Sequence, residues 1–408
     1  MPGVSSFLGF GSGEKNIAEH LFLLFIFSKT QTAVPGETLL LLLPKALSLA
    51  AILYDQFDNS NQNYKMKNLL IIIYIATCIC SCNQSPKTID TVSNQDSVSA
   101  TNEVKTGGCK MIQVDGKYNV WTKKVGDGKI KVLLLHGGPG FSHDYMECFE
   151  DFLPKEGIEF YYYDQLGCGN SDVPKDTSLW NFPRYIEEVE QVRKGLGLDS
   201  FYLFGHSWGS MLAMEYLNKY QQHVKAAILS NMTAGIKSYV TYTAKLKKQF
   251  LNAEDLSIYD SLDKRKDYNN PLFQSILLNK LYSQVLCQIP VEKWPEPLVR
   301  AEKKANMAIY IQMQGIDEFH VTGNFKNWEM WDRLPNIKVP TLVIGGMKDE
   351  MNPDDMKKEG QLITNSRTYL CSKGSHMSMY DDQQNYFKNL IGFLKDVEGN
   401  KFAPDKKQ

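Results

Sequence analysis

Ser207 has the residue type and the local setting that nucleophilic catalysis requires. It lies at the centre of the motif G-x-S-x-G at residues 205–209, directly after the apolar run at residues 201–204. A serine hydroxyl becomes a useful nucleophile when a sharp strand-to-helix turn exposes it beside a general base, and flanking glycines allow that turn. Residues 210–217 have the composition of the helix that should follow. The order of strand, turn and helix therefore favours a catalytic Ser207 over an ordinary turn of small residues.

The acid partner is expected at Asp349, in the loop after the strand-like run at residues 339–346. A carboxylate in this position would fix the tautomer of a catalytic histidine and stabilise its charged form. Three other carboxylates lie near it in the sequence and compete for the same role: Glu350, Asp354 and Asp355.

The base is expected at His376, which follows a short strand-like run at residues 368–371 and precedes a helical pattern at residues 385–394. It would take the proton of Ser207 and return it to the leaving group. Of the seven histidines, His136 is interpreted as a structural residue at a strand end and His206 as the variable position of the elbow. The chain order Ser207, Asp349, His376 is the order of hydrolases with this elbow, and it differs from both major serine protease orders.

A glycine-rich loop that could bind a developing oxyanion follows the apolar run at residues 131–135. Its sequence is H-G-G-P-G, at residues 136–140. In hydrolases with this elbow, the oxyanion is held by the backbone N–H after the nucleophile and by one from the loop after an earlier strand. These donors would belong to Trp208 and Gly138. The alternative is a plain glycine-proline turn that closes a strand.

Together, these motifs carry a resemblance to a known family. H-G-G-P-G, the stretch D-Q-x-G-x-G-x-S at residues 164–171 and the G-x-S-x-G elbow resemble those of the proline iminopeptidases, serine peptidases with the α/β-hydrolase fold. The likeness extends over residues 118–394. It implies an α/β fold with a mostly parallel central sheet, flanking helices and an inserted helical cap. It also implies release of an N-terminal residue, preferably proline, from short peptides through an acyl-enzyme. One departure is Leu166, where many members of the family have arginine.

Residues 313–323 resemble the tricorn-interacting aminopeptidase branch of this family. The resemblance implies that Glu318 and Glu350 bind the free amino terminus of the substrate. Two carboxylates suit that task, because charge-assisted hydrogen bonds hold an ammonium group at a fixed distance from the nucleophile. The alternative is that both glutamates are solvated surface acids.

The motifs also divide the chain. We expect the two halves of the hydrolase core at residues 108–232 and 333–396, a helical cap at residues 233–332 and a polar tail at residues 397–408. The clearest helical candidates in the cap are residues 245–256 and 298–314. A cap inserted between the nucleophile and the acid would roof the active site and contribute aromatic residues to the substrate pocket.

The N-terminal region predicts export and lipidation. Residues 66–82 have the charged start and short apolar run of a secretory signal, and they end in a lipobox-like stretch with Cys82 as the lipidated residue. Residues 83–107 would form a flexible polar linker to an enzyme anchored by lipid to the membrane of a bacterial cell envelope. The alternative is a buried hydrophobic helix in a cytoplasmic protein. Residues 1–65 are an uncertain extension that a wrongly assigned start codon would explain.

Composition excludes several other classes. Lysine and arginine number 45 against 46 for aspartate and glutamate, without a basic block, so nucleic acid is not expected as a partner. The cysteines show no metal-ligand spacing and the chain has no dinucleotide fingerprint, so neither a metal nor a cofactor is expected. Two rival functions remain: an amidase or esterase with the same triad, and a non-catalytic binding protein with a hydrolase fold. Oligomeric state, disulfides and the preferred first residue stay open.

Overall fold

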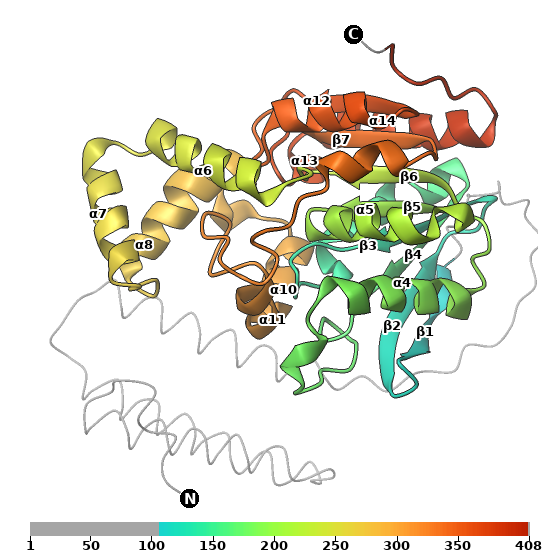
Figure 1. Cartoon of the computed structure of the whole chain (residues 1–408), viewed down its shortest axis with the longest axis horizontal. Helices are drawn as coiled ribbons and strands as arrows, with labels where there is room; N and C mark the ends of the chain where they lie inside the picture. The colour runs from blue at the N-terminus through green and yellow to red at the C-terminus, as the bar shows by residue number, and fades with distance from the viewer. Residues whose placement is uncertain (1–105, 407–408) are drawn as a thin grey trace, which may run out of the picture. The chain divides into compact units, whose positions relative to one another are not determined.

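The computed structural model describes residues 106–406 (Figure 1). The extension at residues 1–65, the signal at residues 66–82 with Cys82, and the linker except for its last two residues lie outside the described residues. No helix between residues 106 and 406 has both the length and the apolar character that crossing a bilayer requires.

An eight-stranded sheet in the order β1-β2-β4-β3-β5-β6-β7-β8 forms the centre of the described chain. β1 and β2 pair antiparallel, as do β2 and β4, and every other pair is parallel. Strands buried on both faces need continuous apolar sequences, which is why the runs after residues 130 and 200 fold this way. The strands are β1 (Thr106–Val114), β2 (Tyr118–Val125), β3 (Ile130–Leu135), β4 (Ile158–Tyr163), β5 (Phe201–His206), β6 (Val224–Ser230), β7 (Thr341–Gly346) and β8 (Ser366–Cys371).

Helices cover both faces of the sheet, as the α/β prediction requires. On one face, α4 (Phe182–Leu196), α5 (Trp208–Tyr220) and α12 (Pro353–Leu362) share a hydrophobic cluster with Leu133 and Leu135. On the other face, α14 (Gln383–Glu398) and the 3-10 helix η2 (His143–Asp151) pack with Val132 and Leu134. Alternate residues of β3 therefore face opposite clusters, as the period of a strand dictates.

The order of the strands creates a crevice at one point of the sheet. From β3 the chain passes to β4 on one side, and it later returns to β5 on the other side of β3. The loops after β3 and β5 therefore leave in opposite directions, and a crevice opens between them at the carboxyl ends of the strands. The glycine-rich loop and Ser207 both lie at this point of the sheet.

A helical insertion lies between β6 and β7 and has a small hydrophobic cluster of its own, which includes Leu246, Tyr259, Phe273 and Phe319. Figure 1 shows α6, α7 and α8 grouped beside the sheet. We call this insertion the cap. Its helices are α6 (Ile236–Phe250), α7 (Ala253–Lys264), α8 (Pro271–Ile276), the π-helix η6 (Leu277–Tyr282), α9 (Ser283–Val285), η7 (Val291–Lys293), α10 (Glu296–Lys304) and α11 (Met307–Met313).

Both cap helices expected from the sequence are broken in the structure. Residues 245–256 are divided between α6 and α7, because the Asn252 side chain accepts a hydrogen bond from Asp255 N and begins a new helix. Residues 298–314 are divided between α10 and α11, where Asn306 caps in the same way through Ala308 N. An asparagine cap satisfies backbone N–H groups that a continuous helix would satisfy internally, so it favours a restart.

The C-terminal residues are more ordered than a polar tail would be. α14 continues to Glu398, two residues beyond the expected end of the core. Phe402 packs on the hydrophobic cluster of α14, and Asp405 N donates to Ser366 O at 2.8 Å. Thr368 N donates in turn to Asp405 Oδ2 at 2.7 Å. The tail thus lies along the outer edge of β8. The remaining short helices are η3 (Pro154–Glu156), η4 (Thr177–Leu179), η5 (Gln221–His223), η8 (Trp331–Asn336) and α13 (Ser378–Asp381).

Candidate active site

Ser207 occupies the sharp turn between β5 and α5. Its φ of 54° and ψ of −125° are rarely adopted by a residue with a side chain, so the surrounding packing must impose them. The flanking glycines make the turn sterically feasible. A Cβ on Gly205 would lie 2.2 Å from Gly209 O, and one on Gly209 would lie 2.1 Å from Leu135 O. The sequence forms this elbow because no larger residue fits at either position.

His376 and Asp349 are hydrogen-bonded in the structure. The His376 Nδ1 to Asp349 Oδ1 distance is 2.9 Å, and both side chains are buried. Asp349 is held in turn by Asn231, whose Nδ2 donates to Asp349 Oδ2 at 2.7 Å, and by Met351 N at 3.0 Å. A carboxylate only accepts hydrogen bonds, so Nδ1 carries the proton and Nε2 is left to act as a base.

Ser207 and His376 line the same cavity. His206, the neighbour of the nucleophile, has its ring centroid 5.0 Å from that of His376, and its Nε2 lies 3.0 Å from His376 O. Among residues 106–406, no hydrogen bond joins the Ser207 hydroxyl to His376. Such a bond often forms only in the complex with substrate, so the shared cavity is the informative observation.

The cap contributes to the position of His376. His376 N donates to Val285 O at 2.8 Å, and Met377 N donates to Leu286 O at the same distance. Val285 ends α9, so the loop that holds the base is tied to the cap by two backbone hydrogen bonds. A displacement of this part of the cap would therefore also displace the base.

Two backbone N–H groups are candidates for the oxyanion hole, those of Trp208 and Gly138. Trp208 is the first residue of α5, where a backbone N–H has no intrahelical acceptor. In the glycine-rich loop, Gly137 N donates to the Tyr145 hydroxyl at 2.6 Å, so the N–H of Gly138 is the one left for a ligand. The loop lies against the nucleophile, since a Cβ on Gly137 would lie 3.1 Å from Ser207 Cβ.

Gln165 of the D-Q-x-G-x-G-x-S stretch joins the other two motifs. Its Oε1 accepts a hydrogen bond from the Trp208 indole at 2.8 Å, and its Nε2 donates to His136 O at 3.0 Å. His136 Nε2 accepts from Gln165 N at 3.0 Å, which supports the structural role expected for this histidine. The three motifs thus form one hydrogen-bonded unit around the elbow. Leu166 is buried in the core and is not among the residues that line the cavity.

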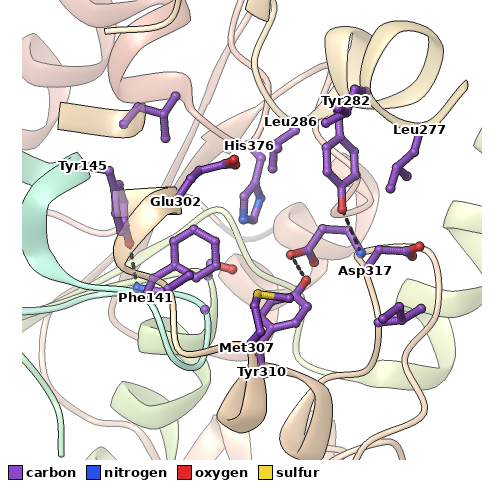
Figure 2. Close-up of a pocket in the computed structure, with 18 of the residues that line it drawn as sticks. Phe141, Tyr145, Leu277, Tyr282, Leu286, Glu302, Met307, Tyr310, Asp317 and His376 are labelled. Atoms are coloured by element: carbon purple, nitrogen blue, oxygen red, sulfur yellow. Dashed lines mark hydrogen bonds between the residues drawn. The ribbon is translucent and has the colours of Figure 1, made fainter. Parts of the chain in front are cut away.

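Glu318 lies in the cavity within a group of hydrogen-bond donors. Its carboxylate accepts from the hydroxyls of Tyr310 at 2.6 Å and Tyr239 at 2.7 Å, and from Gln314 Nε2 at 3.1 Å. The Tyr282 hydroxyl accepts from Glu318 N at 3.2 Å. Burial raises the pKa of all three tyrosines well above the ordinary value, so their hydroxyls remain protonated. Figure 2 shows Tyr282 and Tyr310 converging on this part of the cavity.

Glu350 is fully buried beside the catalytic histidine. Its Oε1 lies 3.2 Å from His376 Nδ1, and within the described chain no hydrogen bond reaches either carboxylate oxygen. Burial raises the pKa of Glu350 well above the ordinary value. Neither Glu350 nor Glu318 is therefore a solvated surface acid, and that alternative is wrong. Glu318 lines the cavity, whereas Glu350 lies behind His376 and is not among the lining residues.

The two carboxylates next to His376 change its protonation. Burial alone would lower the pKa of the imidazole, but the charges of Glu350 and Asp349 outweigh it and raise the pKa to about 10. Glu350 and His376 compete for one proton. When Glu350 is charged, it stabilises the imidazolium form of His376. When Glu350 is protonated, only the charge of Asp349 stabilises that form. His206 differs: burial lowers its pKa to about 3, so it stays neutral.

The cavity has a volume of about 310 Å³ and is lined by both the core and the cap. The core provides the elbow, the glycine-rich loop and His376. The cap provides most of the remaining wall, including aromatic side chains, as the sequence led us to expect. These cap residues include Tyr268, Phe273, Leu277, Tyr282, Glu302, Met307 and Tyr310.

Two groups of side chains could be mistaken for metal sites, since each brings three ligand atoms within 4.8 Å. One consists of Asp349, Glu350 and His376, which the hydrogen bonds above already organise. The other consists of His143, Asp144 and Glu147, where Arg300 supplies a cation: its Nη1 lies 2.5 Å from Asp144 Oδ1 and its Nη2 lies 2.7 Å from Glu147 Oε2.

Several supporting residues were not found from the sequence. Asn231 holds Asp349, Tyr145 holds the glycine-rich loop and Tyr239 holds Glu318. The only sequence signal for Asn231 is its position directly after β6, at the same sheet edge as Ser207. The tyrosines come from separate segments and have no common spacing.

Comparison with known proteins shows the fold and the family of the chain. Residues 131–383 match the family described as alpha/beta hydrolase fold. The chain is 46% identical over 288 residues to a proline iminopeptidase of Chitinophaga pinensis, covering 70% of this chain and 96% of that protein. It is 44% identical over 289 residues to a proline iminopeptidase of Flavobacterium johnsoniae, covering 70% and 97%. The crystal structure of a Mycobacterium smegmatis proline iminopeptidase superposes on this chain with a TM-score of 0.67 and a sequence identity of 24%. The match covers 72% of this chain and 99% of that one, and it shows that the two share a fold. The predicted fold class is confirmed.

Proposed function

Because the chain belongs to the proline iminopeptidase family of α/β-hydrolases, we propose that it releases N-terminal proline in preference to other residues from short peptides. Membership makes the chain a serine hydrolase of the aminopeptidase type. The observation that carries the proposal is the pair Glu318 and Glu350 beside the triad. Glu318 accepts three side-chain hydrogen bonds in the cavity. Glu350 is buried, and among residues 106–406 neither of its carboxylate oxygens accepts a hydrogen bond.

The two glutamates would bind the ammonium group of the substrate. A charge-assisted hydrogen bond contributes about 1.5 to 3 kcal/mol, and removal of the ammonium would leave Glu350 buried without compensation. Substrates with a blocked amino group should therefore bind poorly. This requirement distinguishes an aminopeptidase from an esterase or a general amidase with the same triad.

With the ammonium in place, the carbonyl of the first residue would lie at Ser207. His376 Nε2 removes the hydroxyl proton as Ser207 Oγ attacks, and the oxyanion accepts hydrogen bonds from the N–H groups of Gly138 and Trp208. The tetrahedral intermediate collapses when His376 donates that proton to the amine of the second residue, which leaves. Water then gives a proton to His376 and attacks the acyl-enzyme. His376 returns this proton to Ser207 Oγ as the ester bond breaks, and the first residue departs as a free amino acid. Asp349 keeps Nδ1 protonated throughout.

The test compares prolyl-2-naphthylamide with its N-acetyl derivative and with short-chain acyl esters. We expect the wild type to turn over the free prolyl substrate and to lose most of its kcat/KM after acetylation. Glu318→Gln should lower kcat/KM for the free substrate by about tenfold or more, since one charged hydrogen bond is lost.

Each rival function predicts a different outcome. Equal or better turnover of the acetylated substrate or of the esters would favour the amidase or esterase. Ser207→Ala should reduce kcat by about 10⁶, as in a dissected serine protease triad. Binding of a prolyl peptide without turnover, unchanged by Ser207→Ala, would favour the binding protein.

We also propose that the enzyme is anchored to the bacterial cell envelope by lipid on Cys82. The support is the pattern of residues 66–82 and the polar composition of residues 83–107. Metabolic labelling with a radioactive fatty acid should mark the wild-type protein and leave Cys82→Ala unlabelled. Absence of label on the wild type would refute the anchor. Peptide mass mapping of the native N-terminus would show whether residues 1–65 are translated.

A further inference from the structure

The carboxylate of Glu302 lines the same cavity as Ser207 and His376, as do those of Asp317 and Glu318. It comes from α10 of the cap, whereas Glu318 follows α11. Figure 2 shows Glu302 beside Tyr145 and Phe141 on one side of His376, with Tyr282 and Tyr310 on the other side. The hydroxyls of Tyr282 and Tyr310 contact Glu318. Glu302 and Glu318 thus face the reacting centre from opposite sides.

Glu302 has no partner of its own within the described chain, although cations lie close on the same helix. Arg300 is bound to Glu296, Asp144 and Glu147, and Lys304 is bound to Asp144. The carboxylate of Glu302 makes no ion pair or side-chain hydrogen bond among residues 106–406. The side chain of Glu302 is exposed to solvent where it lines the cavity, and nearby protein groups displace enough water to raise its pKa. A cation that entered the cavity on this side would find an unpaired acid.

The substrate brings its second residue to this side. In a peptide, the ammonium and the leaving amine lie on opposite sides of the carbonyl carbon that Ser207 attacks. If Glu318 and Glu350 hold the ammonium, the second residue extends in the other direction, toward Glu302. Apolar side chains of Phe141, Leu298 and Met307 also line the cavity and could pack against the methylene groups of a long side chain.

We infer that Glu302 selects the second residue of the substrate and favours lysine or arginine over glutamate at that position. This inference rests on the proposed aminopeptidase function, because it needs the amino terminus to be bound at Glu318 and Glu350. An accessible ion pair is weak, so the wild type should prefer Pro-Lys-amide to Pro-Gln-amide by roughly two- to fivefold in kcat/KM. Pro-Glu-amide should be the poorest of the three.

The experiment measures kcat/KM for Pro-Lys-amide, Pro-Gln-amide and Pro-Glu-amide with the wild type, Glu302→Gln and Glu302→Lys. The ratio between substrates within one enzyme cancels any loss of folded protein. Glu302→Gln should remove most of the preference for lysine, and Glu302→Lys should invert it in favour of glutamate. Glu296→Gln is the matched control: it makes the same change of charge on the same helix, outside the residues that line the cavity, and should keep the wild-type ratios.

The outcomes separate this inference from the function on which it rests. Turnover of all three amides with a lysine-to-glutamate ratio that stays the same in both Glu302 variants would overturn the inference alone. Loss of the preference in Glu296→Gln as well would also overturn it, because the effect would then come from net charge. No turnover of any of the three by the wild type would overturn both the inference and the proposed function.

Discussion

The substitution Glu350→Gln should move the acidic limb of the pH profile of kcat/KM to lower pH. That limb reports the pKa of the base in the free enzyme, which we assign to His376. The pKa of His376 is raised, and the nearest carboxylates are the reason: Glu350 lies 3.2 Å and Asp349 2.9 Å from its Nδ1. Removal of the Glu350 charge leaves the imidazolium less stable, so the neutral, active form persists to lower pH.

The size of the shift follows from the distance. Two unit charges 3.2 Å apart interact by about 5 kcal/mol at an effective dielectric constant of 20, or almost four pKa units. This figure is an upper limit, because burial raises the pKa of Glu350 and a protonated Glu350 contributes no charge. We expect a downward shift of at least about one pH unit.

The assay is steady-state hydrolysis of prolyl-2-naphthylamide between pH 5 and 10 by the wild type, Glu350→Gln and Glu318→Gln. Both variants lose a proposed ligand of the ammonium group, so kcat/KM should fall in both. Only Glu350→Gln removes the charge that touches His376, and the charge of Glu318 is the weakest of those that raise the histidine pKa. An unshifted acidic limb in Glu350→Gln, or an equal shift in Glu318→Gln, would refute the reasoning.

Three further substitutions test other parts of the structure. Asp349→Asn should lower kcat by about 10⁴ because Nδ1 loses its acceptor, and a loss below tenfold would remove Asp349 from the triad. Arg300→Met should destabilise the fold by about 1 to 3 kcal/mol, since Glu147 loses its cation and Asp144 keeps Lys304 and the Ser142 hydroxyl. The melting temperature should fall by several degrees, and an unchanged melting temperature would contradict this. Tyr310→Phe should raise KM for free prolyl substrates several-fold with a smaller effect on kcat, because Glu318 loses a hydrogen-bond donor. A selective loss of kcat would contradict this role of Tyr310.

The residues that the sequence located well are those whose backbone geometry restricts the residue type. Gly205 and Gly209 flank Ser207 because any side chain there would collide with the backbone, and this restriction is visible as a motif. The strands were predictable for a similar reason. Burial on both faces demands continuous apolar runs, and β3, β5 and β7 show them.

The parts that the sequence did not reveal depend on contacts between distant segments. The tyrosines around Glu318 come from α6, the end of η6 and α11, and no spacing relates Tyr239, Tyr282 and Tyr310. Asn231 reaches Asp349 across 118 positions of the chain. The breaks of the cap helices depend on Asn252 and Asn306, whose preference to cap competes with an amphipathic pattern that would permit a longer helix.

The C-terminal residues along β8 bear on the solubility of the protein. A strand at the border of a sheet exposes unpaired N–H and C=O groups that can recruit a second molecule and start aggregation. Here Asp405 and Ala403 occupy part of that border through contacts with Ser366, Arg367 and Thr368. A purification tag or fusion partner should therefore be joined after residue 406. Truncation before Ala403 would leave the triad residues in place, but it would expose the unpaired backbone groups of β8 and promote aggregation.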